Sequence, residues 1–208
     1  MSHRVDPGFG GERALGDKCA LPSSLYTGVR YKPLLTGGMA LLAGGAMPLA
    51  FAPVGWAWLA VIALATFFVL TAQSSRRQAL WSAYLFGLGY FGVGVSWVFI
   101  SISQYGNGPV VAVLVTAAFV SLLALFPWGV AYLVRCLRPE MDAMALWLGL
   151  PAAWVLSEWM RTWFLTGFPW LFIGYSQTDT TLATIAPVFG VLGVSLLVAL
   201  LALSLIHI

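Results

Sequence analysis

Charged side chains are scarce in this sequence. Only 8% of its 208 residues are charged, 61% are hydrophobic, and the mean hydropathy is +0.92. Several uncharged stretches are long enough to cross a bilayer, which takes about 20 residues each. This composition excludes a soluble globular domain and predicts an all-α, polytopic transmembrane helical bundle. The net charge of +3 is too small and too scattered to indicate nucleic acid as a partner.

Histidine, cysteine and lysine are also rare. The two histidines, His3 and His207, are terminal, which excludes a Ser-His-Asp site and a histidine metal site. The two cysteines, Cys19 and Cys136, lie far apart in polar segments, so we expect inert thiols and no disulfide framework. No metal site is predicted.

The chain divides into a polar leader and an apolar domain. Residues 1–32 predict a disordered cytoplasmic leader, and residues 33–208 predict the transmembrane domain. We expect about six spans, at residues 34–51, 54–72, 79–100, 110–134, 143–160 and 181–205. With the N-terminus in the cytoplasm, nine of the ten lysines and arginines lie inside and only Arg161 lies outside, as the positive-inside rule requires.

Small residues and helix breakers predict close helix contacts, turns and bends in or between these spans. Gly89, Gly92 and Ser96 fall near one helical face, where they would let a neighbouring helix approach closely. Residues 101–109 predict a polar turn, and Pro127 predicts a kink in the fourth span. Before the sixth span, residues 178–181 offer N-cap candidates, and Pro187, Gly190 and Gly193 are expected to bend it.

Residues 157–177 combine opposite charges with many aromatic rings. Glu158 and Arg161 are spaced i, i+3, so they can pair on one helical face close to a membrane boundary. Pro169 ends any helix, which predicts an interfacial or re-entrant segment on the periplasmic side. Three tryptophans of this stretch are typical of a membrane-water boundary: Trp159, Trp163 and Trp170.

This stretch strongly resembles apolipoprotein N-acyltransferase, the enzyme that adds the third acyl chain to bacterial lipoproteins. The residues that carry the resemblance there are Glu158, Trp159, Arg161, Thr166 to Trp170 and Gly174 to Gln177. Further matching residues are Phe51 to Pro53, Gly94 to Val98, Ser101, Gly106, Ala186, Pro187, Gly190 and Val191. The resemblance covers about residues 35–200.

The resemblance implies a bacterial inner-membrane protein with a second, periplasmic nitrilase-like α/β domain that holds a Glu-Lys-Cys triad. In that family a cysteine thiolate takes an acyl chain from phospholipid, and the α-amine of a diacylglyceryl-modified apolipoprotein then attacks the thioester. No cofactor is implied. Membrane phospholipid and that apolipoprotein are the implied partners.

The sequence departs from the family in its catalytic groups. Its only lysines, Lys18 and Lys32, lie in the leader, and Cys136 is predicted to be cytoplasmic. We therefore assign no catalytic residues and expect the nitrilase-like domain to be absent and this chain to be inactive alone. Because the last residues, 204–208, fall inside an apolar helix, we expect a truncated or mis-assembled reading frame.

The first hypothesis is thus the membrane portion of an acyltransferase. Its candidate substrate- or lipid-binding residues are Ser96, Trp97, Glu158, Arg161, Phe168, Trp170, Tyr175 and Gln177. Interfacial anchoring and a local ion pair are the structural alternative for these residues. The second hypothesis is a non-catalytic lipid-binding or transport protein, which would require ionisable residues deep in the bundle or repeated broken spans. A family member that is fused to, or partnered with, a sugar-lipid synthase is a third possibility.

Overall fold

The computed structural model describes residues 33–105, 108–164 and 167–207. The predicted leader, together with Cys19, Gly106 and Thr166, lies outside the described residues. Every regular element in the described part of the chain is helical, which confirms the all-α prediction.

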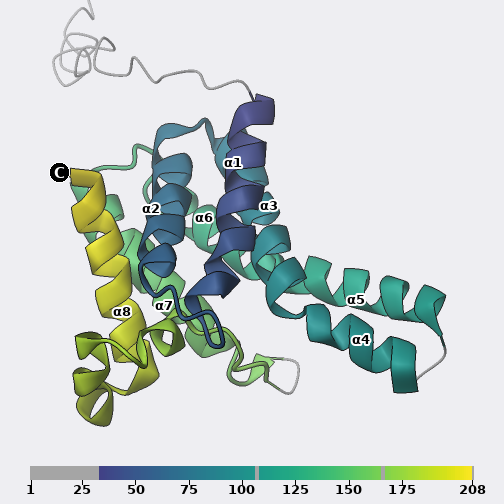
Figure 1. Ribbon diagram of the computed structural model, residues 1–208. Coiled ribbons are helices and arrows are strands. Elements are labelled where there is room, and N and C mark those ends of the chain that lie inside the picture. The colour runs from purple at the N-terminus through teal and green to yellow at the C-terminus, as the bar shows by residue number, and fades with distance from the viewer. Residues whose placement is uncertain (1–32, 106–107, 165–166, 208) are drawn as a thin grey trace, which may run out of the picture.

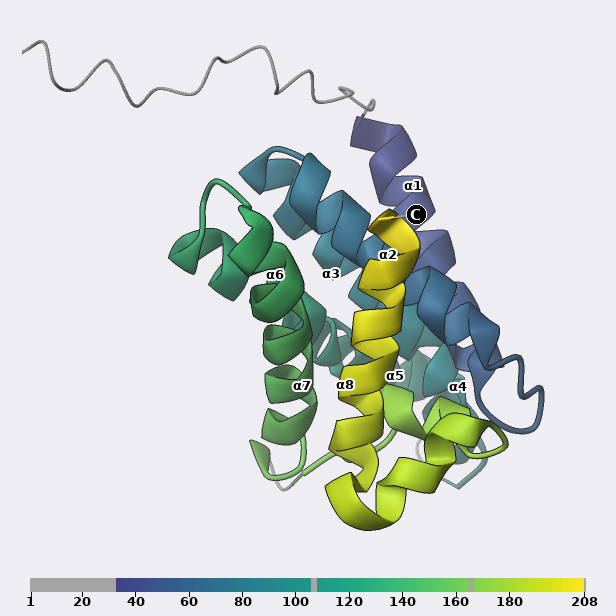
Figure 2. The ribbon, with the colours of Figure 1, turned by 90° about the vertical axis from the view of Figure 1, so that its left-hand side faces the viewer.

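Six α-helices form the main bundle (Figures 1 and 2). They are α1 (Pro33–Ala46), α2 (Trp58–Gln73), α3 (Arg76–Gly94), α6 (Leu125–Leu137), α7 (Leu150–Met160) and α8 (Ala186–His207). Short 3-10 helices η2 (Met47–Ala50), η5 (Ile173–Gln177) and η6 (Thr181–Ile185) extend or connect them, and a π-helical turn, η3 (Ala145–Gly149), leads into α7. The remaining pair, α4 (Ser96–Tyr105) and α5 (Pro109–Leu123), lies side by side and projects from the bundle (Figure 1).

Three helical stretches of the described chain are long and apolar enough to cross a membrane: Pro33–Ala50, Pro109–Leu137 and Thr181–Ile206. The pair α3 and α4 would make a fourth, although it bends by 50°. The count of six spans and the cytoplasmic N-terminus therefore stay predictions.

Two predicted spans depart from a regular α-helix in the structure. The third, expected over residues 79–100, bends at Val95, and its second half continues as helix to Tyr105, where a polar turn was expected. The fourth, expected over residues 110–134, lies within the helical stretch Pro109–Leu137, and only its regular α-helical pattern is interrupted, at Ala124, three residues before Pro127. Proline cannot donate to the carbonyl four residues earlier and its ring clashes with it, so α5 ends at that residue, Leu123.

The structure of the sixth predicted span agrees more closely with its prediction. Thr180 caps η6 by accepting a hydrogen bond from the Leu182 amide at 3.3 Å, as the N-cap pattern predicts. Within α8, Gly190 has φ 68° and interrupts the helix, which confirms one of the three expected bends.

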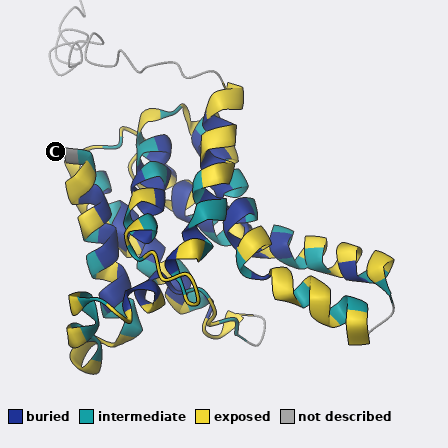
Figure 3. Cartoon of the chain, viewed as in Figure 1, coloured by how far each residue is buried: buried dark blue, intermediate teal, exposed yellow. Residues whose placement is uncertain are grey.

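The core is built where α1 and α3 meet and where aromatic rings join α2, α3 and α7. Side chains added at Gly44 or Gly89 would overlap backbone atoms of the facing helix, so the absence of a Cβ permits this contact. The predicted packing role of Gly89 is confirmed, whereas Gly92 and Ser96 are exposed. The Phe67 ring lies 5.0 Å from Phe86 and 5.3 Å from Trp154, and buried residues follow these inner faces (Figure 3).

Four arginines gather at one end of the bundle. Arg135 donates to the carbonyls of Thr71, Ala72 and Ser74, at the C-terminal end of α2. Arg76 donates to the Cys136 sulfur at 3.2 Å, so α3 begins where α6 ends. Arg77 and Arg138 adjoin them in sequence, whereas Arg161 follows the opposite end of α7.

Candidate functional site

The candidate site is built on an irregular stretch, residues 168–177, which we name the aromatic segment. Gly167 before it has φ 90°, and Leu171 within it has φ 58°, a left-handed conformation that costs a residue with a side chain about 1 to 2 kcal/mol. Residues 168–170 belong to no helix, so their backbone groups need other partners.

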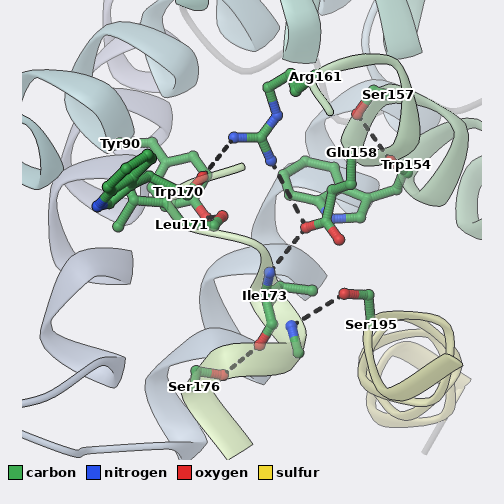
Figure 4. Close-up of polar contacts among 11 residues, drawn as sticks. Tyr90, Trp154, Ser157, Glu158, Arg161, Trp170, Leu171, Ile173, Ser176 and Ser195 are labelled. Atoms are coloured by element: carbon green, nitrogen blue, oxygen red, sulfur yellow. Dashed lines mark hydrogen bonds and ion pairs between the residues drawn. The ribbon is translucent and has the colours of Figure 1, made fainter. Parts of the chain in front are cut away.

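Three side chains, from α3, from α7 and from the residue that follows α7, bind backbone groups of the aromatic segment (Figure 4). Arg161 donates from Nη1 to the Trp170 carbonyl at 3.0 Å, and the Tyr90 hydroxyl donates to the Leu171 carbonyl. Glu158 Oε1 accepts a hydrogen bond from the Ile173 amide at 2.8 Å. Tyr90 of α3, Glu158 of α7 and the C-cap residue Arg161 thereby fix the backbone of the aromatic segment at three closely spaced points.

Glu158 and Arg161 also pair with each other, as the i, i+3 spacing predicts. Arg161 Nη2 lies 3.8 Å from Glu158 Oε1, and the same oxygen accepts from Trp154 Nε1 at 3.1 Å. The exposed fractions of the two side chains are 0% for Glu158 and 2% for Arg161. Glu158 was expected near a membrane boundary. It does lie near the end of α7, but protein encloses it completely.

Aromatic rings surround the Arg161 guanidinium. Its central carbon lies 5.0 Å from the ring centre of Phe172, 5.3 Å from Phe91 and 5.9 Å from Phe126. Rings attract a cation through their negative faces, so they partly offset the cost of removing it from water. This enclosure, together with Glu158, explains how a charged group is accommodated among apolar helices.

The second half of the aromatic segment is fixed against α8 and the chain before α2. The Gly174 amide donates to Ser195 Oγ at 3.0 Å, and a Cβ at Gly174 would overlap the Val191 carbonyl. Gln177 Nε2 donates to the Ala57 carbonyl at 3.2 Å. The predicted candidate Gln177 therefore connects parts of the bundle, whereas Tyr175 is exposed and stacks on Phe172.

Half-exposed rings cover the outer side of the segment. Trp170 stacks with Phe168, with ring centres 5.6 Å apart, and lies 6.5 Å from Trp97 at the start of α4. Ser96 is exposed beside Trp97. Trp159 and Trp163 are also half-exposed, as expected of boundary residues, although their position relative to a membrane stays a prediction.

The structure thus brings five of the eight candidates together: Trp97, Glu158, Arg161, Phe168 and Trp170. Ser96 adjoins this group in sequence, and Tyr175 and Gln177 lie on η5. Sequence reasoning missed Tyr90, Trp154 and Ser195. The i, i+4 spacing of Trp154 and Glu158 could have revealed the first contact, but nothing local marks Tyr90 or Ser195. Among the described residues, no three His, Cys, Asp or Glu side chains gather as a metal site would require.

Comparison with known proteins identifies the family. The family described as "Apolipoprotein N-acyltransferase N-terminal domain" matches residues 43–204. The apolipoprotein N-acyltransferase of Methylococcus capsulatus is 49% identical, over 79% of this chain and 33% of the relative. Those of Coxiella burnetii and Vibrio cholerae are 42% and 41% identical, over 79% and 81% of this chain and 34% of each relative. The chain spans about a third of the length of these curated relatives. It belongs to the apolipoprotein N-acyltransferase family, of which it matches the N-terminal domain.

Proposed function

We propose that this chain forms the membrane portion of an enzyme that N-acylates bacterial lipoproteins in the inner membrane. Its role is to hold the acyl donor, a membrane phospholipid, and the diacylglyceryl group of the acceptor apolipoprotein. The family match over residues 43–204 carries this proposal. The enclosed Glu158 and Arg161 pair supports a fixed, functional placement of the aromatic segment.

The reaction defines what the membrane portion must accommodate. A thiolate attacks the ester carbonyl of the phospholipid, and a thioester forms as the ester C–O bond breaks and the leaving lysophospholipid oxygen takes up one proton. The α-amine of the lipoprotein cysteine then attacks the thioester, which forms an amide, regenerates the thiolate and releases one proton from the amine. Both substrates carry acyl chains, so the membrane portion has to offer them apolar surfaces beside the reacting groups.

The distribution of charge supports a multi-pass orientation with the arginine-rich end in the cytoplasm. Arg76, Arg77, Arg135 and Arg138 share that end, and Arg161 is the one described cation near the other. The aromatic segment then faces the periplasm, where lipoproteins are modified. Exposed apolar side chains on α5, such as Val110 and Leu114, would face lipid.

This chain by itself is proposed to be inactive. Its lysines, Lys18 and Lys32, lie outside the described residues, and Cys136 lies at the arginine-rich end. Cys136 contacts Arg76 at that end and does not adjoin the aromatic segment, so we assign acyl transfer to groups other than Cys136. A non-catalytic lipid-binding or transport function is the competing proposal.

A chimera tests the proposal. Residues 43–204 would replace the matching region of the Methylococcus capsulatus relative, and N-acylation of a diacylglyceryl lipoprotein would be followed by mass spectrometry. We expect acylation by the chimera and none by the 208-residue chain alone. A chimera that inserts and folds but transfers no acyl chain would contradict the proposal and favour the non-catalytic alternative.

A further inference from the structure

Two cavities adjoin each other beside Arg161. The first is a groove of about 390 Å³ between α6 and α7, lined by residues that include Leu125, Gly129, Leu133 and Leu156. The second has a volume of about 260 Å³ and is lined by Arg161, Gly167 and Phe168, among others. Both are lined by the side chains of Leu122, Phe126 and Phe164, so the two cavities lie next to each other there.

The groove has the shape and chemistry of a site for a hydrocarbon chain. It follows α6 from Leu125 to Leu133, a rise of about 12 Å at the helical spacing. Its lining is almost entirely apolar, with Ser157 and Tyr132 as the residues that carry a hydroxyl. α6 and α7 pack together along it (Figure 2). A straight alkyl chain can therefore lie along the two helices.

The second cavity places a cation at the end of this groove. The Arg161 side chain is 2% exposed, and its Nε has no hydrogen-bond partner among the described residues. Its Nη2 lies 3.8 Å from Glu158, which is longer than a direct hydrogen bond. Guanidinium groups bind phosphate oxygens through two parallel N–H donors, so an anionic phosphate would supply what this side chain lacks.

We infer that α6 and α7, together with Phe164, Gly167 and Phe168, form a phospholipid site, with an acyl chain in the groove and the phosphate beside Arg161. This inference rests on the proposed function, because it names where the lipid donor is held. A lone apolar groove would accept any lipid. The adjoining buried cation selects a lipid that carries a phosphate next to its acyl chains.

Gly129 offers a way to close the groove without disturbing the fold. A Cβ at Gly129 would meet no atom within 4 Å, so Gly129→Leu fills the groove rather than a packed interface. Gly38 on α1 is equally open and lies away from the groove, which makes Gly38→Leu the matched control. Both changes replace a helical glycine and should leave thermal stability equal or slightly higher.

The experiment is photolabelling of the full chain in lipid nanodiscs. The probe is phosphatidylethanolamine with a diazirine in one acyl chain, and labelled peptides are identified by mass spectrometry. We expect labelling of the α6 and α7 groove, about tenfold lower in Gly129→Leu and unchanged in Gly38→Leu. A diacylglycerol with the same diazirine chain but no phosphate should label the groove about tenfold less.

Two results would overturn the inference. One is groove labelling that Gly129→Leu does not reduce, and the other is equal labelling by the diacylglycerol, which would remove the role of the phosphate. The readout is binding, so it is separate from acyl transfer. A chimera that fails to acylate while the groove still labels would reject the proposed function and leave the lipid site in place.

Discussion

Glu158 Oε1 accepts a hydrogen bond from the Ile173 amide at 2.8 Å, across fifteen residues of sequence. This bond joins the end of α7 to the first residue of η5, and the loop between them contains Pro169 and the left-handed Leu171. A carboxylate with no exposed surface thus holds a strained turn in place. The charge of Glu158 and the conformation of the aromatic segment are consequently linked.

The first prediction concerns the ion pair itself. Arg161→Met leaves the Glu158 carboxylate buried without its cation, and the loss of one partner of a buried pair costs about 3 to 5 kcal/mol. Glu158→Met should be comparably harmful. The double variant removes both charges and should recover a large part of the loss. Thermal unfolding in detergent measures all three, and a double variant less stable than either single one would contradict the pairing.

The second prediction isolates the hydrogen bond of Tyr90. Tyr90→Phe keeps the buried ring but leaves the Leu171 carbonyl without this donor, which should cost about 1 to 3 kcal/mol. Tyr105→Phe is the control, because Tyr105 is 88% exposed at the end of α4. Hydrogen exchange of peptides from the aromatic segment should rise in Tyr90→Phe alone. Equal exchange in both variants would mean that this bond does not hold the segment.

The sequence predicted those parts of the site that depend on local spacing. The pairing of Glu158 with Arg161 follows from their separation on one helix, and the break at Gly190 follows from glycine's access to positive φ. The complete burial of Glu158 could not be predicted in this way. Glu158 is enclosed because the aromatic segment folds back onto it through Ile173, and Tyr90 and Ser195, from distant parts of the chain, bind that segment at Leu171 and Gly174.

The bend between α3 and α4 shows a second limit of local patterns. A polar turn was expected over residues 101–109, yet the first five of these residues include no glycine or proline, and the helix continues to Tyr105. The chain bends at Val95 instead, where Gly94 lets the Leu171 side chain approach. That position is determined by packing against the aromatic segment, which the sequence of the helix does not reveal.

The third prediction tests the close contact of α1 with α3. Gly89→Ala introduces a methyl group that would overlap the Leu41 carbonyl, so the two helices must separate. We expect a loss of about 1 to 3 kcal/mol, as is usual for overpacking. Gly38→Ala, on the exposed face of α1, should be neutral or stabilising by up to about 1 kcal/mol. The measurement is the melting temperature of each variant in detergent. Equal melting temperatures for the two variants would contradict the close contact of α1 with α3.

The fourth prediction compares a buried arginine with an exposed one at the same end of the bundle. Arg135 is 8% exposed and donates from Nε and Nη2 to carbonyls at the end of α2, where a cation also complements the helix dipole. Arg135→Lys keeps the charge but loses the two-pronged geometry, so several buried carbonyls lose their donor.

We therefore expect Arg135→Lys to destabilise the protein by about 1 to 3 kcal/mol. Arg138→Lys is the matched control, because Arg138 is about half-exposed in its ion pair with Asp142, and such pairs contribute about 0 to 1 kcal/mol. Thermal unfolding and hydrogen exchange near residues 71–74 provide the measurement. If both lysine variants behave alike, positive charge at this end is sufficient and the fork geometry of Arg135 has no separate role in holding α2 to α6.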